Sequence, residues 1–177
     1  MLYLLDANVL ITANNTYYPV NQVPEYWEWL RFHGDAGNVK MPIEILDEVL
    51  AGHKENDPLL DWLKDTDTIS ALPLQEEVDH QLVQRVVATG YAPDLTDDEL
   101  EQLGRDPFLV AYALAGPDRC VVTTEVSRPG KTRQNRKIPD VCKTFSIQCL
   151  DPFALNRMLG FKTGWKTVTV ERQIPSD

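Results

Sequence analysis

The sequence predicts an α/β protein: a three-layer sandwich with a mostly parallel, twisted sheet of four to five strands and helices on both faces. Short, continuous apolar runs such as residues 2–5 and 120–123 are typical of strands that are buried on both faces of a sheet. Helical patterns separate these runs, and this alternation is typical of βαβ units with right-handed connections. The chain has 177 residues and no internal repeat, so we expect one domain over residues 1–160.

Proline and glycine divide the first third of the chain into short elements, because they begin or end helices. Pro24 and Pro42 each stand at the start of a helical segment, and Gly52 follows the second one. The expected elements are a strand at 2–5, helices at 9–14, 25–31 and 43–50, and a brief extended piece at 39–41.

In the remainder of the chain, three Asp-Pro pairs and a capping box mark the starts of helices. The capping box is Thr96 with Glu99, and Gly90 ends a long amphipathic helix. The expected elements are strands at 68–72, 120–123 and 147–150, and helices at 59–64, 74–89, 97 onward, 108–115, 139–145 and 152–159. In the tail, 161–177, residues 168–170 are an edge strand or a partner-binding segment; otherwise the tail is frayed.

Composition excludes several classes of protein. The formal net charge of −10 argues against a general basic surface for nucleic acid, although a local basic patch is compatible with it. The three cysteines form no CxxC pair, which argues against a disulfide framework or a zinc site. No apolar run approaches the ~20 residues that span a bilayer, and no leader is visible, so we expect a cytoplasmic protein without membrane contact.

The segment 17–32 is dense in aromatic residues. We expect these rings to pack the segment onto the body of the protein, and a surface for stacking bases or docking a partner is the alternative.

Several acids are predicted to meet at the carboxyl edge of the sheet, where open α/β sheets bind ligands. Asp6 follows the first strand and Glu125 follows the strand at 120–123, although Asp6 is equally placed to cap the next helix. Asp106 begins a buried helix and should approach the same edge, but Asp57 and Asp151 begin helices with the same Asp-Pro pair.

A further acid comes from the helix at 43–50. Asp47 and Glu48 flank its apolar face on opposite edges, and periodicity does not choose between them. Converging carboxylates raise one another's pKa, and a divalent cation resolves the repulsion. Because the set holds only oxygen ligands, we expect Mg²⁺ or Mn²⁺, which could activate a water molecule towards a phosphate.

A basic cluster follows Glu125 immediately and supports a phosphate substrate. A solvated loop is the alternative. Its members are Arg128, Lys131, Arg133, Arg136 and Lys137.

Together these motifs resemble the PIN-domain family of metal-dependent ribonucleases, over roughly residues 2–150. The family has an apolar strand ending in Asp, a Glu on an early helix, an Asp opening an Ala-rich helix, and a strand ending in Thr plus an acid. The matching stretches, in chain order, are Leu4-Leu5-Asp6-Ala7-Asn8, Asp47-Glu48-Val49-Leu50, Asp106-Pro107-Phe108-Leu109-Val110-Ala111 and Val121-Val122-Thr123-Thr124-Glu125.

The resemblance implies an endoribonuclease whose metal ligands are Asp6, Glu48, Asp106 and Glu125; many relatives carry Asp in place of Glu125. It further implies that Asn8 and Thr123 orient the acids. Asp140 is either a supporting residue or a helix-start acid. The branch that this sequence looks like is often regarded as the toxin of toxin–antitoxin pairs, which implies an RNA substrate and a protein antitoxin, and leaves a homodimer open.

Other functions fit the sequence less well. An aspartyl-phosphate phosphohydrolase needs a second Asp two residues after the nucleophile, and position 8 is Asn. A receiver-like domain is shorter and carries paired acids ahead of its phosphoacceptor. The main rival is a non-catalytic PIN-like scaffold that binds RNA or protein.

Overall fold

The computed structural model describes residues 1–52 and 56–166, which form an α/β fold around one parallel sheet. Every pairing between adjacent strands of this sheet is parallel. The strands are, in spatial order, β2 (Val39–Lys40), β1 (Leu2–Leu5), β3 (Arg119–Val122) and β4 (Gln148–Leu150).

The α-helices connect these strands and flank the sheet. They are α1 (Ala7–Thr12), α2 (Pro24–Asp35), α3 (Ile43–Ala51), α4 (Pro58–Lys64), α5 (Thr66–Ala71), α6 (His80–Arg85), α7 (Asp97–Leu103), α8 (Asp106–Leu114), α9 (Ile138–Thr144) and α10 (Pro152–Met158). The π-helical segments η1 (Ala13–Tyr17) and η2 (Val86–Tyr91) continue α1 and α6, and η3 (Arg133–Asn135) is a short 3-10 helix.

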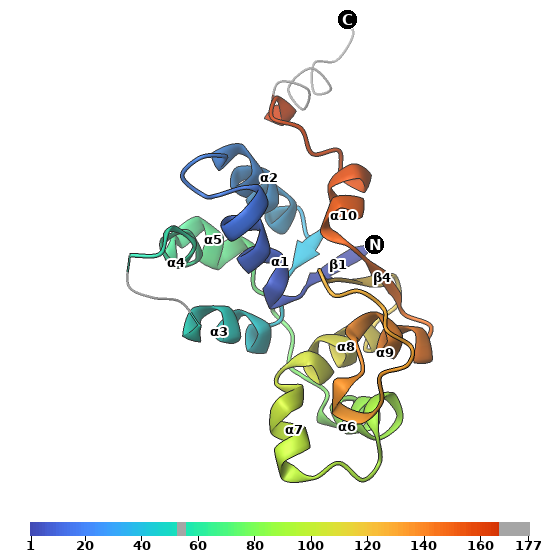
Figure 1. Ribbon diagram of the computed structural model, residues 1–177. Coiled ribbons are helices and arrows are strands. Elements are labelled where there is room, and N and C mark those ends of the chain that lie inside the picture. The colour runs from blue at the N-terminus through green and yellow to red at the C-terminus, as the bar shows by residue number, and fades with distance from the viewer. Residues whose placement is uncertain (53–55, 167–177) are drawn as a thin grey trace, which may run out of the picture.

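Helices cover both faces of the sheet: α2 and α10 lie on one side, and α8 and α9 lie on the other (Figure 1). The predicted three-layer α/β sandwich is therefore confirmed, with a PIN-like arrangement. The central strands are buried because they are apolar on both sides; Leu4, Leu5 and Val121 have no exposed surface.

Two sequence predictions about individual elements were wrong. Residues 68–72 are not a strand: most of them belong to α5, which begins where the Asp65 side chain accepts a hydrogen bond from the backbone N–H of Asp67. The brief extended piece predicted at 39–41 contains the strand β2, which pairs with β1 on the side opposite β3. The helix predicted at 74–89 begins only at His80, because the Asp79 side chain caps it there.

Most rings of the aromatic segment 17–32 pack onto the body, as expected, although Tyr17 and Phe32 are exposed. Tyr26, Trp27 and Trp29 are each 1% exposed, and the Trp27 indole donates a hydrogen bond to the carbonyl of Tyr18 at 2.7 Å. The rings of Tyr18 and Tyr26 stack with their centroids 4.3 Å apart. Burial of these large rings attaches α2 to the body of the protein.

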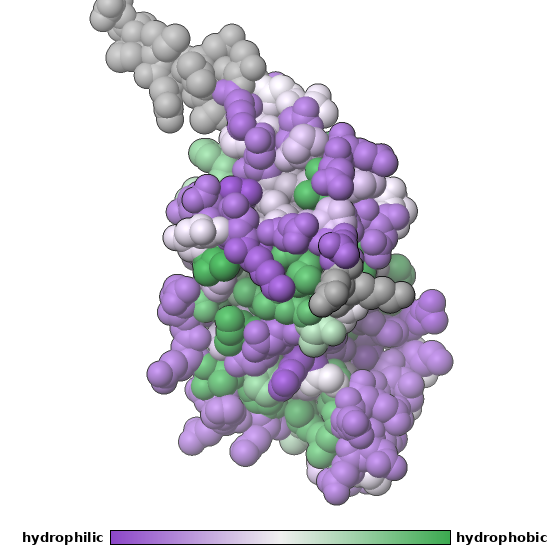
Figure 2. Space-filling model, turned by 90° about the vertical axis from the view of Figure 1, so that its left-hand side faces the viewer, coloured by the Kyte–Doolittle hydropathy of each residue, from purple (hydrophilic) through white to green (hydrophobic). Residues whose placement is uncertain are grey.

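Helix α3 differs in detail from its predicted amphipathic pattern. Its apolar face is buried at Ile45, Leu46 and Val49, but Ile43 is 44% exposed. Glu44 accepts a hydrogen bond from the Tyr112 hydroxyl. Figure 2 shows the side of the molecule that carries α3, where hydrophobic residues form a band between hydrophilic regions.

The predicted capping box is present at the start of α7, with reciprocal hydrogen bonds between Thr96 and Glu99. Within residues 1–52 and 56–166, no helix combines the length and apolar character that crossing a membrane requires. The edge strand considered at 168–170 lies outside the described residues.

Candidate active site

Asp6 and Thr123 are adjacent because of the register between β1 and β3. Leu5 pairs with Val122, so the next residue of each strand emerges at the same carboxyl edge of the sheet. The Thr123 hydroxyl donates a hydrogen bond of 2.6 Å to Oδ2 of Asp6, and both residues are buried. Asp6 stands at the N-cap position of α1, but its side chain makes no capping hydrogen bond. Its carboxylate is therefore turned towards β3 rather than used as a helix cap.

Asn8 links the Asp6 carboxylate to the backbone that follows Thr123. Its side-chain amide donates to Oδ2 of Asp6, and its Oδ1 accepts the backbone N–H of Thr124 at 2.9 Å. Thr123 Oγ1 in turn accepts the backbone N–H of Glu125 at 3.1 Å. These hydrogen bonds fix the orientation of the Asp6 carboxylate.

Asp106 differs from the other two aspartates that precede a proline. Asp57 Oδ1 accepts the backbone N–H of Leu59 at 2.9 Å, and Asp151 Oδ1 accepts that of Ala154 at 2.8 Å, so both are helix caps. Asp106 lies inside α8, whose N-cap residue is Arg105, and no side-chain capping bond is made there. The Asp106 carboxylate is thus left for another role.

The carboxylates of Asp6, which is buried, and Asp106, which is half-buried, carry the electrostatic signature of a functional site. Burial, followed by the negative charges of Glu125 and Glu48, raises the pKa of Asp6 to about 6, against the lowering effect of the Thr123 hydrogen bond. Burial, followed by the negative charges of Asp6, Glu125 and Glu48, raises the pKa of Asp106 to about 8. The pKa of Asp106 is therefore raised by the charges of all three other predicted acids.

The structure also chooses between Asp47 and Glu48. Both are exposed on α3, but it is Glu48 whose charge raises the pKa of Asp6 and of Asp106. Glu48, rather than Asp47, therefore lies close enough to Asp6 and Asp106 for its charge to affect them.

Glu125 is held by protein groups of its own. One carboxylate oxygen forms an ion pair with Lys137, and the other accepts the backbone N–H of Ile138 at 2.8 Å. Sequence reasoning had placed Lys137 in a loop that contacts RNA, whereas the structure places its ammonium group against Glu125. The positive charge of Lys137 also lowers the pKa of Asp106, so it offsets part of the negative charge of both acids.

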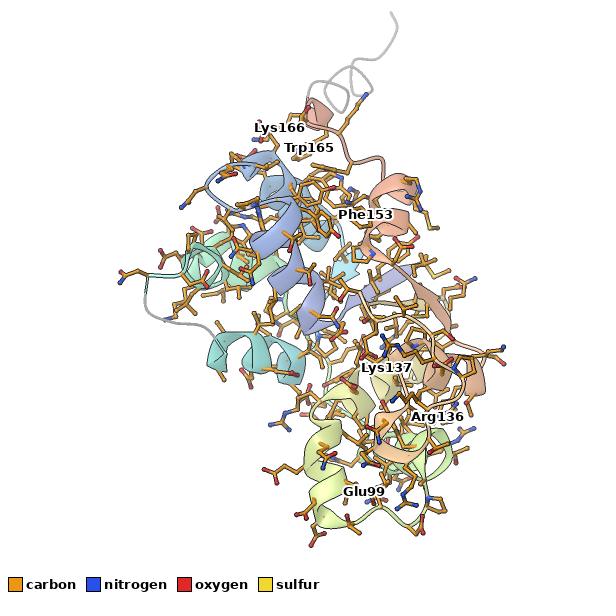
Figure 3. The ribbon with its side chains drawn as sticks, in the orientation of Figure 1. Glu99, Arg136, Lys137, Phe153, Trp165 and Lys166 are labelled. Atoms are coloured by element: carbon orange, nitrogen blue, oxygen red, sulfur yellow. The ribbon has the colours of Figure 1, made fainter. Side chains whose placement is uncertain are left out.

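Other members of the basic cluster are likewise engaged by the protein. Arg133 binds Glu99 through two hydrogen bonds and Asp94 at 2.7 Å, so it fastens the loop to α7. Arg136 donates to the carbonyls of Gly90 and Asp140. Figure 3 shows Lys137 near the middle of the molecule and Glu99 below it. The loop therefore extends from Lys137 down to Arg133, which binds Glu99 on α7.

Asp140 anchors the start of the same loop and does not contact the acid cluster directly. Its carboxylate accepts hydrogen bonds from the Ser127 hydroxyl and from the backbone N–H of Arg128, the latter at 2.7 Å. Arg128 and Lys131 are exposed, so these two residues, rather than five, form the solvent-facing basic surface of the loop.

The four acids are the predicted ligands of Mg²⁺ or Mn²⁺. In the described part of the chain, no group of three or more His, Cys, Asp or Glu side chains is arranged to hold a metal ion. The chemistry of the set does fit: it consists of oxygen donors, and the carboxylates of the buried Asp6 and the half-buried Asp106 repel each other. A hard divalent cation offsets this repulsion, and Asp6 and Asp106 are the residues that would hold it.

Sequence reasoning missed one residue near these acids. Tyr91 is buried, and the negative charges of Asp106 and Glu125 both raise the pKa of its hydroxyl. Nothing in the local sequence marked it, because Tyr91 follows Gly90 at a predicted helix end.

Comparison with known proteins places the chain in a family. No curated protein matches the sequence. One family model matches residues 3–163, which is nearly the whole described fold and includes every acid discussed above. The chain therefore belongs to the family described as a domain of unknown function, DUF4411.

Proposed function

We propose that this chain is a metal-dependent endoribonuclease that hydrolyses RNA phosphodiester bonds. The observation that carries the proposal is the pairing of the buried Asp6 with the half-buried Asp106, whose pKa values are both raised. Asp6 follows β1 and Asp106 lies in α8. Burial, together with the negative charge of Asp6, raises the pKa of Asp106 to about 8. A fold that maintains such repulsion is expected to use it for binding a cation.

In this proposal Asp6 and Asp106 hold Mg²⁺ or Mn²⁺, with Glu48 and Glu125 supporting from the rim. When bound, the cation would supply activation of water and stabilisation of charge on the phosphate. Thr123 and Asn8 keep the Asp6 carboxylate oriented through their hydrogen bonds.

The substrate side of the proposal rests on the loop after Glu125. Lys137 is committed to Glu125, but Arg128 and Lys131 are exposed on the same loop. We expect these two side chains to contact the RNA backbone, because such contacts need only accessible positive charge.

The resemblance to PIN toxins extends the proposal to a biological role. The chain would be the toxin of a toxin–antitoxin pair in the cytoplasm, inhibited by a protein antitoxin. A neighbouring gene whose product suppresses growth arrest on co-expression would support this role.

The test is cleavage of labelled RNA with Mn²⁺, with EDTA as a control. Wild-type protein should cleave, and Asp6→Asn should reduce the rate by at least about 100-fold while its melting temperature stays equal or rises. Asp151→Asn is the matched control, because Asn caps a helix as well as Asp does. Binding of RNA without cleavage in any divalent metal would replace the proposal with the non-catalytic scaffold.

A further inference from the structure

Two exposed aromatic side chains, Tyr17 and Phe153, lie against each other on the surface. Tyr17 is 50% exposed and Phe153 is 40% exposed. Their rings form an edge-to-face pair with centroids 4.8 Å apart, although the two residues come from opposite ends of the chain. The Asp151 cap fixes the start of α10 and so holds Phe153 in place. Exposed apolar side chains that gather in a patch commonly mark a binding site.

The two rings border a small hollow in the surface. Its other walls come from α1, η1, Tyr26, Thr124 and Pro152. The residues that line the hollow carry no formal charge, although the chain has a net charge of −10. A polyanion can therefore approach this patch without meeting a carboxylate in its walls.

The hollow lies at the carboxyl edge of the sheet, beside the acids. Phe153 follows β4 closely, and the carbonyl of Leu150, the last residue of β4, accepts the backbone N–H of Thr123 at 3.1 Å. Thr124 follows Thr123, whose hydroxyl binds Asp6. Only β3 stands between β4 and β1, so the ends of β4 and β1 are two strand spacings apart, which is about 10 Å. A phosphate held at Asp6 would therefore have its neighbouring nucleotides within reach of the hollow.

We propose that Tyr17 and Phe153 form a nucleobase subsite, which holds one unpaired base of a single-stranded RNA by stacking. This inference rests on the proposed function and narrows its substrate class to single-stranded RNA. Every base has a planar π-face, so an aromatic ring binds unpaired bases without selecting a sequence. In a double-stranded RNA the bases are stacked inside the helix, so the subsite would not engage them.

The experiment measures the affinity of a labelled single-stranded RNA in EDTA, where binding is separated from metal-dependent cleavage. The double variant Tyr17→Leu, Phe153→Leu keeps apolar side chains but removes both rings, and it should bind about 10-fold more weakly. The slope of log K against log salt should stay unchanged, because no phosphate contact is lost. Both proteins should bind a double-stranded RNA of the same length with equal affinity.

Two further variants control for folding. Tyr17→Phe with Phe153→Tyr retains both rings and should bind like wild type. Phe32→Leu removes another 40% exposed ring, which packs against Trp165 on α2's side of the molecule and does not line the hollow. This variant should also bind RNA like wild type.

The outcomes separate the subsite from the proposed function. Wild-type affinity in the double leucine variant, equal weakening by Phe32→Leu, or failure of wild type to bind single-stranded RNA in EDTA would overturn the subsite even if the wild-type protein cleaves RNA in Mn²⁺. Loss of a homodimer in the double leucine variant, with unchanged RNA affinity, would also overturn it and assign the patch to contact between two copies of the chain. If the double variant binds RNA more weakly as expected but wild type cleaves no RNA with any divalent metal, the subsite stands and the ribonuclease proposal fails.

Discussion

At the scale of single residues, the three Asp-Pro pairs show how one local motif serves different purposes. Asp57 and Asp151 accept backbone N–H groups and so begin α4 and α10. Asp106 is displaced by one position into α8, with Arg105 as the N-cap residue. The shift of one residue turns a capping side chain into a half-buried carboxylate whose pKa is raised by the charge of Asp6.

Asp106→Asn should therefore change stability in a pH-dependent way. The folded protein raises the pKa of Asp106 to about 8 from an ordinary 3.8, so folding favours the protonated form. The free energy of unfolding that this group provides is fullest at low pH and is lost as the pH rises towards 8. The free energy of unfolding of Asp106→Asn should exceed that of wild type by about 1–3 kcal/mol at pH 9. The two values should converge near pH 4.

Urea unfolding at a series of pH values measures this difference. Asp151→Asn is the control, because its carboxylate caps α10 and an Asn keeps the cap. A loss of stability in Asp106→Asn at pH 9 would show that the ionised carboxylate is stabilised by the fold, contrary to our expectation.

At the scale of elements, the loop between β3 and α9 separates two kinds of basic residue. Arg133 and Arg136 bind α7, the carbonyl of Gly90 and the start of α9, so they shape the loop. Arg128 and Lys131 are exposed at its outer end. The loop is thus fixed by some of its charges and presents the others to solvent.

Replacing both Arg128 and Lys131 by Ala should weaken RNA binding while the melting temperature stays near that of wild type. Each lost phosphate contact should lower the salt dependence of binding, the slope of log K against log salt, by about 0.7 for a single strand. Arg133→Ala should instead lower the melting temperature, because it removes the contacts to Glu99 and Asp94. Filter binding at several salt concentrations tests this; an unchanged slope for the double variant would assign RNA contact to another surface.

At the scale of the whole molecule, cation binding and folding are linked through the acids. Binding needs Asp6 and Asp106 ionised, whereas the fold alone raises their pKa to about 6 and about 8. Mn²⁺ should therefore raise the melting temperature more at pH 8 than at pH 5. At 100 times the Kd the gain is ~2.7 kcal/mol, or roughly 5–10 °C for a domain of this size.

Thermal melting with and without Mn²⁺ at the two pH values measures this linkage, and Asp6→Asn should abolish the shift. An equal shift in wild type and Asp6→Asn would locate the cation elsewhere on the acidic surface.

The sequence by itself determined the layer architecture, because buried parallel strands read as continuous apolar runs such as Leu2–Leu5. It also nominated Asp6, Glu125 and Asp106, since acids at strand ends and helix starts collect at one sheet edge, whereas Glu48 was nominated only through the resemblance to the PIN-domain family. It could not show that residues 68–71 belong to α5, because a short apolar run fits a strand or a buried helix equally well and the Asp65 cap decided it.

Only the tertiary structure decided which charges meet. It paired Lys137 with Glu125, attached Arg133 to α7 and left the Tyr91 hydroxyl buried without a hydrogen-bond partner among the described residues. These pairings join residues far apart in the chain, so their geometry depends on how η2, α7, α8 and α9 pack together. A local sequence pattern reports the backbone of its own element, whereas burial and charge, which set the pKa of Asp106, are properties of the packed whole.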